Sequence, residues 1–344
     1  MAEHGGSDFL VPAVKVTLGG SNLVEELGAC LERVEVVLDL RGESSAEIVL
    51  WDCYDLEGHT ITAELKKVLL PGSILEVFLG YQSSLKKVFS GYLDSAGLDI
   101  SEEGYTVCLM GCDVVHLMKE SRHTRCFQND THSAVFQEVM KPYAWLCSAS
   151  ADDTEAMTAG EVRMQDGEDY SFVTEELVGA ETAGWEFYVQ NGTAYFTKSE
   201  ESPEDTLTLK PDSGVRKLSA FWSFLNKTVT VQGCGSDHTV YTVSTEAKAA
   251  VLDKEAGAGT DFQRIPCLDS EEKVTAWAAS EADGMKGKTK KASVNLTGTP
   301  GLLAGSYISL EEFDSYVNGQ YRIVKAVHVL DEEGYRTEAE LEGG

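Results

Sequence analysis

Basic residues are scarce in this sequence. Its 344 residues include 28 Lys and Arg against 57 Asp and Glu, which gives a formal net charge of −29. Because phosphate binding needs clustered Lys and Arg, this balance disfavours nucleic acid as a tight partner. The excess of acidic over basic residues is concentrated in residues 126–205, which hold 3 basic and 17 acidic residues. The length favours two or three domains.

Long apolar runs and a secretion signal are also lacking. No stretch approaches the ~18 consecutive apolar residues of a membrane span. The N-terminus has neither the basic start nor the apolar segment of a signal peptide. We therefore expect a soluble chain that is made in the cytoplasm and does not insert into a membrane.

The cysteines show no disulfide framework. Several lie within apolar runs, which is typical of buried free thiols. The eight positions are Cys30, Cys53, Cys108, Cys112, Cys126, Cys147, Cys234 and Cys267. Cys108, Cys112 and His116 form a C-x3-C-x3-H pattern, but the first is expected in a strand and the last in a helix, without a fourth ligand nearby. We predict core thiols and a packing histidine, with no metal and no cofactor.

Motifs of common hydrolases and nucleotide-binding enzymes are absent. The patterns GxSxG, HExxH, P-loop and strand-linked GxGxxG do not occur. Carboxylates are so numerous that adjacent pairs do not indicate catalysis. Asp113 is expected to be a helix N-cap, and His328 a structural residue within a strand. We therefore predict no catalytic, cofactor-binding or metal-binding residues, and a protein that is not an enzyme.

A short repeat marks the two ends of the chain. Leu69–Ile74 recurs as Leu302–Tyr307, and Glu102–Tyr105 recurs in the same order as Glu332–Tyr335. Each copy predicts a turn into a strand, then a long strand and a hairpin. This pattern favours two similar small β-barrels, because closure removes exposed strand edges.

Each module needs two further strands. In the first module they are predicted at residues 34–40 and 46–54. Their counterparts in the second module are predicted at residues 221–233 and 239–244. A connecting helix is expected at residues 270–283, with Asp269 and Glu272 as a capping box and Gly284 after its end.

In the segment between the modules, the spacing of apolar residues changes from that of strands to that of helices. Residues 130–141 and 169–183 have helical spacing of apolar residues, whereas residues 185–196 are typical of a hairpin with Asn191–Gly192 at its turn. The chain is thus predicted to be mainly β, with a small α+β insert between two barrels. The predicted domains are residues 1–125, 126–205 and 206–344.

This order of elements resembles the baseplate hub proteins of contractile injection systems, namely the phage late-control D proteins and the hub part of VgrG. The resemblance rests on residues 88–118, 169–196 and 298–343. The last segment is the most specific. It combines a small-residue turn into a strand, the pattern Asn-Gly-x-Tyr-x-Ile, and a strand that carries a histidine before a Gly-Tyr hairpin.

The resemblance implies a structural protein. In that family, two tail-tube-like split barrels per chain form a ring of three chains, and the resulting six similar units adapt a hexameric tail tube to a trimeric spike. It implies a homotrimer that contacts the tube protein, a spike protein, and the tape-measure and baseplate wedge proteins, in a phage tail or injection particle made in bacteria. Because the chain ends at Gly344 after the second barrel, we expect a separate spike protein.

Two other functions remain open at this point. A tip adhesin or carbohydrate-binding β-module would also fit a β-rich chain without catalytic motifs. A thiol hydrolase would need one of the eight cysteines to pair with His116 or His328, and nothing in the sequence pairs them.

Overall fold

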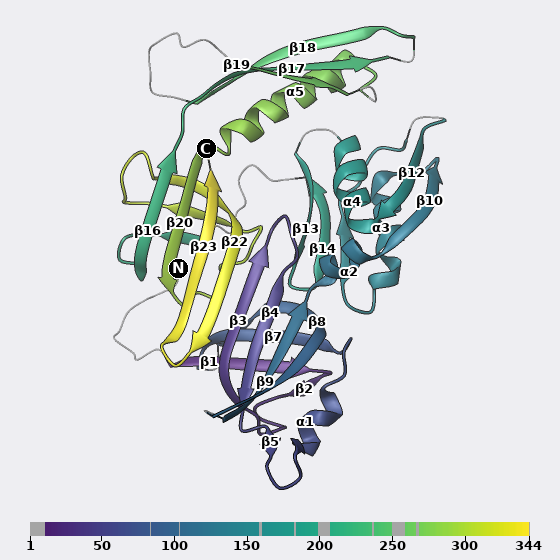
Figure 1. Cartoon of the computed structure of the whole chain (residues 1–344). Coiled ribbons are helices and arrows are strands. Elements are labelled where there is room, and N and C mark those ends of the chain that lie inside the picture. The colour runs from purple at the N-terminus through teal and green to yellow at the C-terminus, as the bar shows by residue number, and fades with distance from the viewer. Residues whose placement is uncertain are drawn as a thin grey trace.

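Strands make up most of the structure, a computed structural model that describes residues 11–82, 84–102, 104–157, 160–181, 184–198, 207–235, 237–249, 259–265 and 268–343. Its central feature is a 13-stranded sheet, accompanied by four smaller sheets and a few helices (Figure 1). The predicted class, mainly β with an α+β insert, is confirmed, whereas the described strands do not close into the two predicted barrels but form one open main sheet. Among the described helices, none is both long enough and apolar enough to span a membrane.

Six antiparallel strands form the first module. In sheet order they are β3 (Cys30–Asp39), β4 (Ser45–Trp51), β9 (Gly104–Cys112), β8 (Ser84–Ser101), β7 (Ile74–Tyr81) and β1 (Pro12–Leu18). Alternate residues enter the core, such as Val34, Val36 and Leu38 of β3, because successive side chains point to opposite faces of a sheet. The remaining elements are β2 (Ser21–Asn22), β5 (Tyr54–Asp55), β6 (Thr60–Ile61) and α1 (Ala63–Val68).

Six strands also form the second module. In sheet order they are β16 (Val215–Trp222), β20 (Lys290–Thr297), β23 (Gly334–Gly343), β22 (Gly319–Asp331), β21 (Tyr307–Leu310) and β15 (Leu207–Leu209). All neighbours are antiparallel except β15 and β21, which are parallel. Strands β16, β20, β23, β22 and β21 therefore repeat the order of β3, β4, β9, β8 and β7.

The structural repeat extends to irregularities of the backbone. A bulge follows Leu93 in β8 where it pairs with β9, and another follows Ile323 in β22 where it pairs with β23. The two positions are 230 residues apart, the same offset that separates Tyr105 from Tyr335 in the sequence repeat. Because bulges are specific features of a fold, their agreement indicates that the sequence repeat reflects two equivalent modules.

The predicted counterparts of β3 and β4 are wrong. Residues 221–233 and 239–244 fall largely in β17 (Leu225–Cys234) and β18 (Val240–Ala249), which pair with β19 (Gly259–Arg264) in a sheet of their own. The true counterparts are β16 and β20. The sequence pattern misleads because β17 and β18 also form a hairpin in which apolar and polar residues alternate. Strands β17, β18 and β19, with the helix that follows them, form an excursion of the chain that interrupts the second module between β16 and β20.

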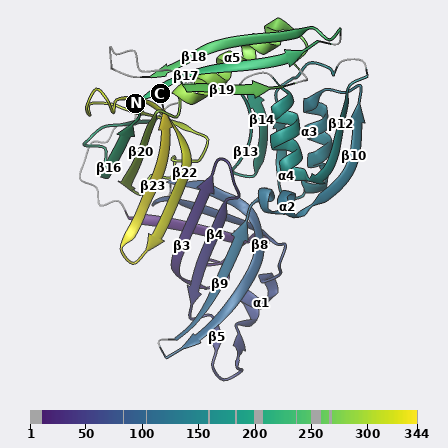
Figure 2. The ribbon, with the colours of Figure 1, turned by 45° about the horizontal axis from the view of Figure 1, so that its top comes forward.

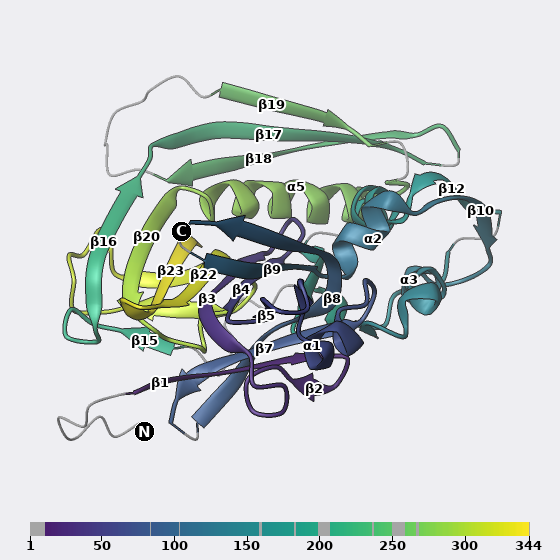
Figure 3. The same ribbon diagram turned by 60° about the horizontal axis from the view of Figure 1, so that its bottom comes forward.

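Helix α5 (Glu271–Lys286) covers one face of the excursion sheet (Figure 3). Val274, Ala278 and Ala282 of the helix pack with Val229 and Val231 of β17 in a separate core. The predicted helix is confirmed, but its cap is Ser270, whose hydroxyl accepts a hydrogen bond from the Lys273 amide, and the helix continues past Gly284.

The insert lies beside the modules, has its own core and begins with α2, before the predicted boundary at residue 126 (Figure 2). Its helical elements are α2 (Val114–Glu120), α3 (His132–Met140), a short 3₁₀ turn at Lys141–Tyr143, and a run that begins as α4 (Asp169–Ser171), continues as a π-helix at Phe172–Leu177 and ends as a 3₁₀ turn at Val178–Ala180. Its strands are β10 (Arg122–Gln128), β11 (Ser148–Ala151), β12 (Val162–Glu168), β13 (Trp185–Gln190) and β14 (Thr193–Lys198). Asn191 and Gly192 both have positive φ, as a tight hairpin requires, so the predicted turn is confirmed.

Candidate functional site

The two modules are joined by direct strand pairing. Residues 34–39 of β3 pair antiparallel with residues 325–330 of β22, which also pairs with β23. One continuous ladder therefore runs through both modules, visible in Figure 1 as β16, β20, β23, β22, β3 and β4 side by side. The described strands do not close this ladder into a ring, and its edges are the candidate assembly surfaces.

His328 lies at the centre of the module junction and is completely buried. Its Nε2 is 2.9 Å from the Leu302 carbonyl oxygen and therefore donates, whereas its Nδ1 accepts from the hydroxyl of Tyr335 at 2.9 Å. Burial lowers the pKa of His328 to about 4. The residue is thus a neutral imidazole held between the loop residue Leu302 and Tyr335 of β23, in a structural position.

The junction covers one edge of β22, but the equivalent edge of β8 is left open. Strand β7 pairs with β8 only as far as Tyr92, and the described pairings place no strand beside residues 95–100 on that edge. Strand β16 likewise pairs with β20 on one side and with no described strand on the other. Unpaired edges are templates for association with another chain.

Apolar side chains are exposed along both open edges. In β8, Leu98 and Ile100 are 41% and 56% exposed, whereas His328, which occupies the place of Leu98 in the second module and pairs with β3, is fully buried. In β16, Phe221 and Trp222 are 71% and 56% exposed. Gathered on unpaired edges, such residues indicate an interaction surface rather than a normal solvated strand.

The two open edges carry opposite charge. Asp94, Asp99 and Glu102 are exposed at the β8 edge, whereas Arg216 and Lys217 are exposed on β16. Complementary charges favour an encounter between different edges and disfavour pairing of like edges. The electrostatics therefore match the β8 edge with the β16 edge.

The insert is fixed to the second module by an arginine. Arg322 of β22 forms a bidentate ion pair with Glu186 of β13. The guanidinium also lies over the rings of Tyr188 and Tyr307, 5.6 and 5.4 Å from their centres. Planar pairing and ring stacking are typical of arginine rather than lysine. Strand β13 is thereby held in a defined position against the main sheet.

The C-x3-C-x3-H pattern does not form a metal site in the structure. Cys108 and Cys112 are on β9, and His116 is on α2, where it faces the carboxylates of Glu43 and Asp94. Within the described ranges, no cluster of His, Cys, Asp and Glu could hold a metal ion.

Asp113 is the N-cap of α2, as predicted. Its carboxylate accepts hydrogen bonds from the amides of Val115 and Ser44, at 2.9 and 3.0 Å. Burial raises the pKa of Asp113 to about 7. Its two partners are backbone groups of α2 and of the turn before β4, so the side chain ties the start of the insert to the first module.

Four of the described cysteines have thiols that burial makes less reactive. Burial raises the pKa of the Cys112 thiol to about 11 and that of Cys147 to about 12. Burial also raises the pKa of Cys53 and Cys108. Reactive cysteines have lowered pKa values instead. Cys267 lies outside the described residues.

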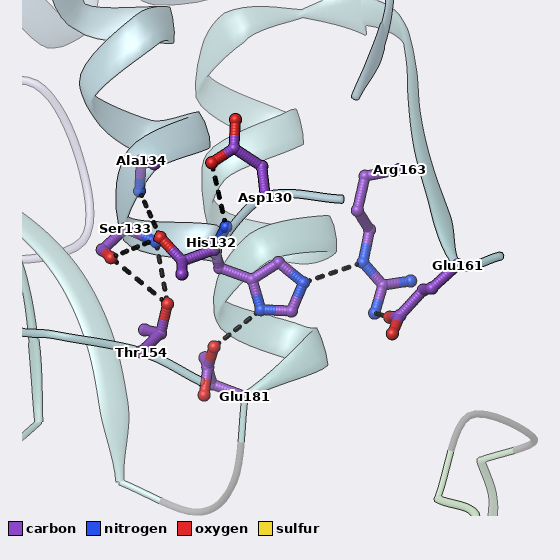
Figure 4. Close-up of polar contacts among 9 residues, drawn as sticks. Asp130, His132, Ser133, Ala134, Thr154, Glu161, Arg163 and Glu181 are labelled. Atoms are coloured by element: carbon purple, nitrogen blue, oxygen red, sulfur yellow. Dashed lines mark hydrogen bonds and ion pairs between the residues drawn. The ribbon is translucent and has the colours of Figure 1, made fainter. Parts of the chain in front are cut away.

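One cluster of the insert has the composition, but not the geometry, of a serine hydrolase triad (Figure 4). His132 Nδ1 is 2.6 Å from Glu181 Oε1, and its Nε2 accepts a hydrogen bond from Arg163 at 3.1 Å. Ser133 contacts the hydroxyl of Thr154 rather than the imidazole. A general base must reach the proton of its nucleophile. The cluster is therefore a polar contact between α3, β12 and the segment after Ala180.

A second buried cluster surrounds Asp169. Its carboxylate receives hydrogen bonds from Arg125, Tyr143 and Gln165, and lies 2.8 Å from His123 Nδ1. A buried charge with several donors is compensated. This network joins β10, β12 and the helical elements. The sequence predicts only that a helix begins at Asp169 and does not predict this network.

Solved structures of tail proteins share the overall fold. A tail protein from Neisseria meningitidis MC58 is 15% identical, with 96% of each chain covered and a TM-score of 0.70. The 43 kDa tail protein of prophage MuSo2 from Shewanella oneidensis is 13% identical, with 96% of this chain and 98% of that chain covered and a TM-score of 0.66. At these identities the likeness shows a common fold.

A third structure comes from a secretion system. The E. coli c3393 protein, a component of the type VI secretion system described as similar to the T4 tail proteins gp27 and gp5, is 12% identical. The match covers 92% of this chain and 74% of that chain, with a TM-score of 0.61. The fold is therefore common to phage tails and a secretion system.

The sequence itself matches one family. No curated protein sequence is significantly similar to the chain. A family model described as the Alg8 N-terminal domain, however, matches residues 10–332. This match includes the first module, the insert, the excursion and all of the second module except β23. The chain therefore belongs to the Alg8 N-terminal domain family.

Proposed function

We propose that the protein is the structural hub of a phage tail or contractile injection-system baseplate. In this role three copies form a ring, and their six modules adapt a hexameric tail tube on one side to a trimeric spike on the other. The protein acts by binding and stacking rather than by catalysis. The tail and type VI secretion proteins that share the fold support this assignment.

The observation that carries the proposal is the agreement between the two modules. They share strand order and bulge position, and they are already joined edge to edge within one chain through β3 and β22. Repeating that contact between chains would place six similar modules around one axis. Because the first and second modules of each chain differ, the ring would have three-fold symmetry. Such a ring meets the geometric need of a six-to-three adaptor.

The proposed partners follow from this geometry. The tube ring would contact the six modules, and the spike would seat on the opposite face. The tape-measure and wedge proteins of the same particle are further proposed contacts. The excursion formed by β17, β18, β19 and α5 lies on the second module only, so it would contribute three equal projections to the ring and thereby distinguish alternating modules.

Sedimentation of the purified chain, alone and with the tube protein encoded in the same gene cluster, tests this function. We expect a trimer that binds one hexameric tube ring. A chain that stays monomeric and does not bind the tube ring would contradict the hub assignment. A trimer that binds glycans but no tube protein would instead favour an adhesin.

A further inference from the structure

We propose that residues 95–100 of β8 pair antiparallel with residues 218–223 at and just after β16 of a second copy of this chain. The main sheet would then continue from one copy to the next. This inference rests on the proposed trimer, and it adds the surface, the partner and the register of the contact.

The register follows from the repeat. One residue of β4 pairs with Val36 of β3 on one side and with Gly111 of β9 on the other. In the same way, one residue of β20 pairs with Ala220 of β16 on one side and with Leu341 of β23 on the other. Gly111 and Leu341 are 230 residues apart, which is the offset between the modules. Val36 and Ala220 are therefore equivalent. A bulge after Leu31 in β3 and one after Val215 in β16 support the same alignment.

The internal junction then serves as the template. His328 lies opposite Val36 within the chain, so Leu98 is expected opposite Ala220 of the neighbouring copy. One step along each strand, Asp99 is expected opposite Ser219, just as Val329 lies opposite Glu35.

Exposure supports this alignment. Ala326 and His328 lie in the stretch of β22 that pairs with β3 and are fully buried, whereas their equivalents in β8, Ala96 and Leu98, are exposed. Leu38 of β3 is buried, whereas Trp222, its equivalent in β16, is more than half exposed. The same places in the two modules thus differ in exposure according to whether a partner strand is present.

Charge supports the choice of partner. In this register Asp99 is diagonal to Lys217 of the neighbouring copy, and Glu102 approaches the same basic end of β16. Diagonal cross-strand neighbours are within reach of long side chains. Because each copy offers one acidic edge and one basic edge, the contact is head-to-tail and can close into a ring.

Cysteine cross-linking tests the register. The Asp99→Cys chain is mixed with a Ser219→Cys chain and oxidised, and the products are separated on a non-reducing gel. A matched mixture of Asp99→Cys with Leu218→Cys is the control, since a one-residue shift points the second side chain to the other face. We expect most of the first mixture to cross-link and at least fivefold less of the control. Each single variant oxidised alone gives the background from natural cysteines.

An edge variant gives an independent measurement. Ile100→Lys alters a side chain that is 56% exposed, so the isolated chain is expected to fold and to lose association. Met164→Lys is its control, because Met164 is a similarly exposed apolar residue, at 64%, on β12 in the insert, away from both edges. Circular dichroism verifies folding of both variants, and sedimentation measures a loss of trimer for Ile100→Lys only.

The outcomes separate the inference from the proposed function. A trimer without the Asp99–Ser219 cross-link would overturn the inference and leave the hub function intact. In-register cross-links in dimers or open chains would support the surface and count against a three-fold hub. A monomer without cross-links would overturn both. A trimer with the in-register cross-link supports both.

Discussion

Val36 of β3 lies directly opposite His328 of β22, and both side chains are fully buried where the two modules meet. The imidazole is neutral because burial disfavours its charge, and its two nitrogens bond to Leu302 and Tyr335. The junction therefore contains one polar residue whose protonation would be costly. This places a pH-dependent element between the two modules.

Acid is expected to weaken the module junction through His328. Its pKa is about 4 in the folded chain and about 6.5 when unfolded, so stability is lost as pH falls from 6.5 toward 4. Chemical unfolding should show that the wild type loses about 2 kcal/mol between pH 7 and pH 5 relative to His328→Gln. The glutamine can make similar hydrogen bonds but does not titrate. Parallel pH profiles for the two chains would contradict this role.

Two glycines of β8 should respond differently to alanine. A Cβ at Gly91 would lie 2.3 Å from the Cys112 carbonyl oxygen, whereas a Cβ at Gly97 would meet nothing within 4 Å. Gly91→Ala should lower the free energy of unfolding by about 1–3 kcal/mol. Gly97→Ala, the matched control, should be neutral or stabilise by up to about 1 kcal/mol. Urea unfolding measures both, and equal effects would count against the described packing of β8 on β9.

Loss of the Asp113 cap should be more harmful than loss of an ordinary cap. Asp113→Ala leaves two backbone amides, at Val115 and Ser44, without their acceptor in a buried place, and should cost about 2–3 kcal/mol. Ser270→Ala removes one cap bond of α5 and should cost about 1 kcal/mol. Thermal unfolding compares the two, and a smaller effect at Asp113 than at Ser270 would be inconsistent with its linking role.

The ion pair between Arg322 and Glu186 should hold the insert against the second module. A double-mutant cycle with Arg322→Ala and Glu186→Ala should give a coupling energy of about 1–3 kcal/mol. Each single variant should speed proteolytic cleavage between the insert and the main sheet. Arg322→Lys keeps the charge and serves as control. The lysine variant should restore only part of the protection against proteolysis, because lysine cannot form the bidentate ion pair.

Local signals in the sequence predicted much of the fold. The hairpin at Asn191–Gly192, the helix around residues 132–140 and the cap at Asp113 each depend on a few neighbouring residues, and the structure contains all three. The repeat was also visible, because it is carried by residues at turns whose backbone geometry restricts the sequence.

Long-range pairing was less accessible to sequence analysis. The pairing of β16 with β20 spans an excursion that forms its own sheet, so the local pattern favours the nearby strands β17 and β18 as members of the module instead. The candidate surface was missed for a similar reason. Leu98 and Ile100 fit an ordinary half-buried strand, and only the position of β7 shows that no partner covers them.

Electron microscopy of the assembled chain tests the central claim most directly. Class averages viewed along the ring axis should show three copies and six similar lobes, with the excursion at every second lobe. The mass of the particle should be three times the 37.4 kDa of one chain. A stable monomer, or a ring in which the modules of neighbouring copies do not touch, would contradict a hub built from two equivalent modules.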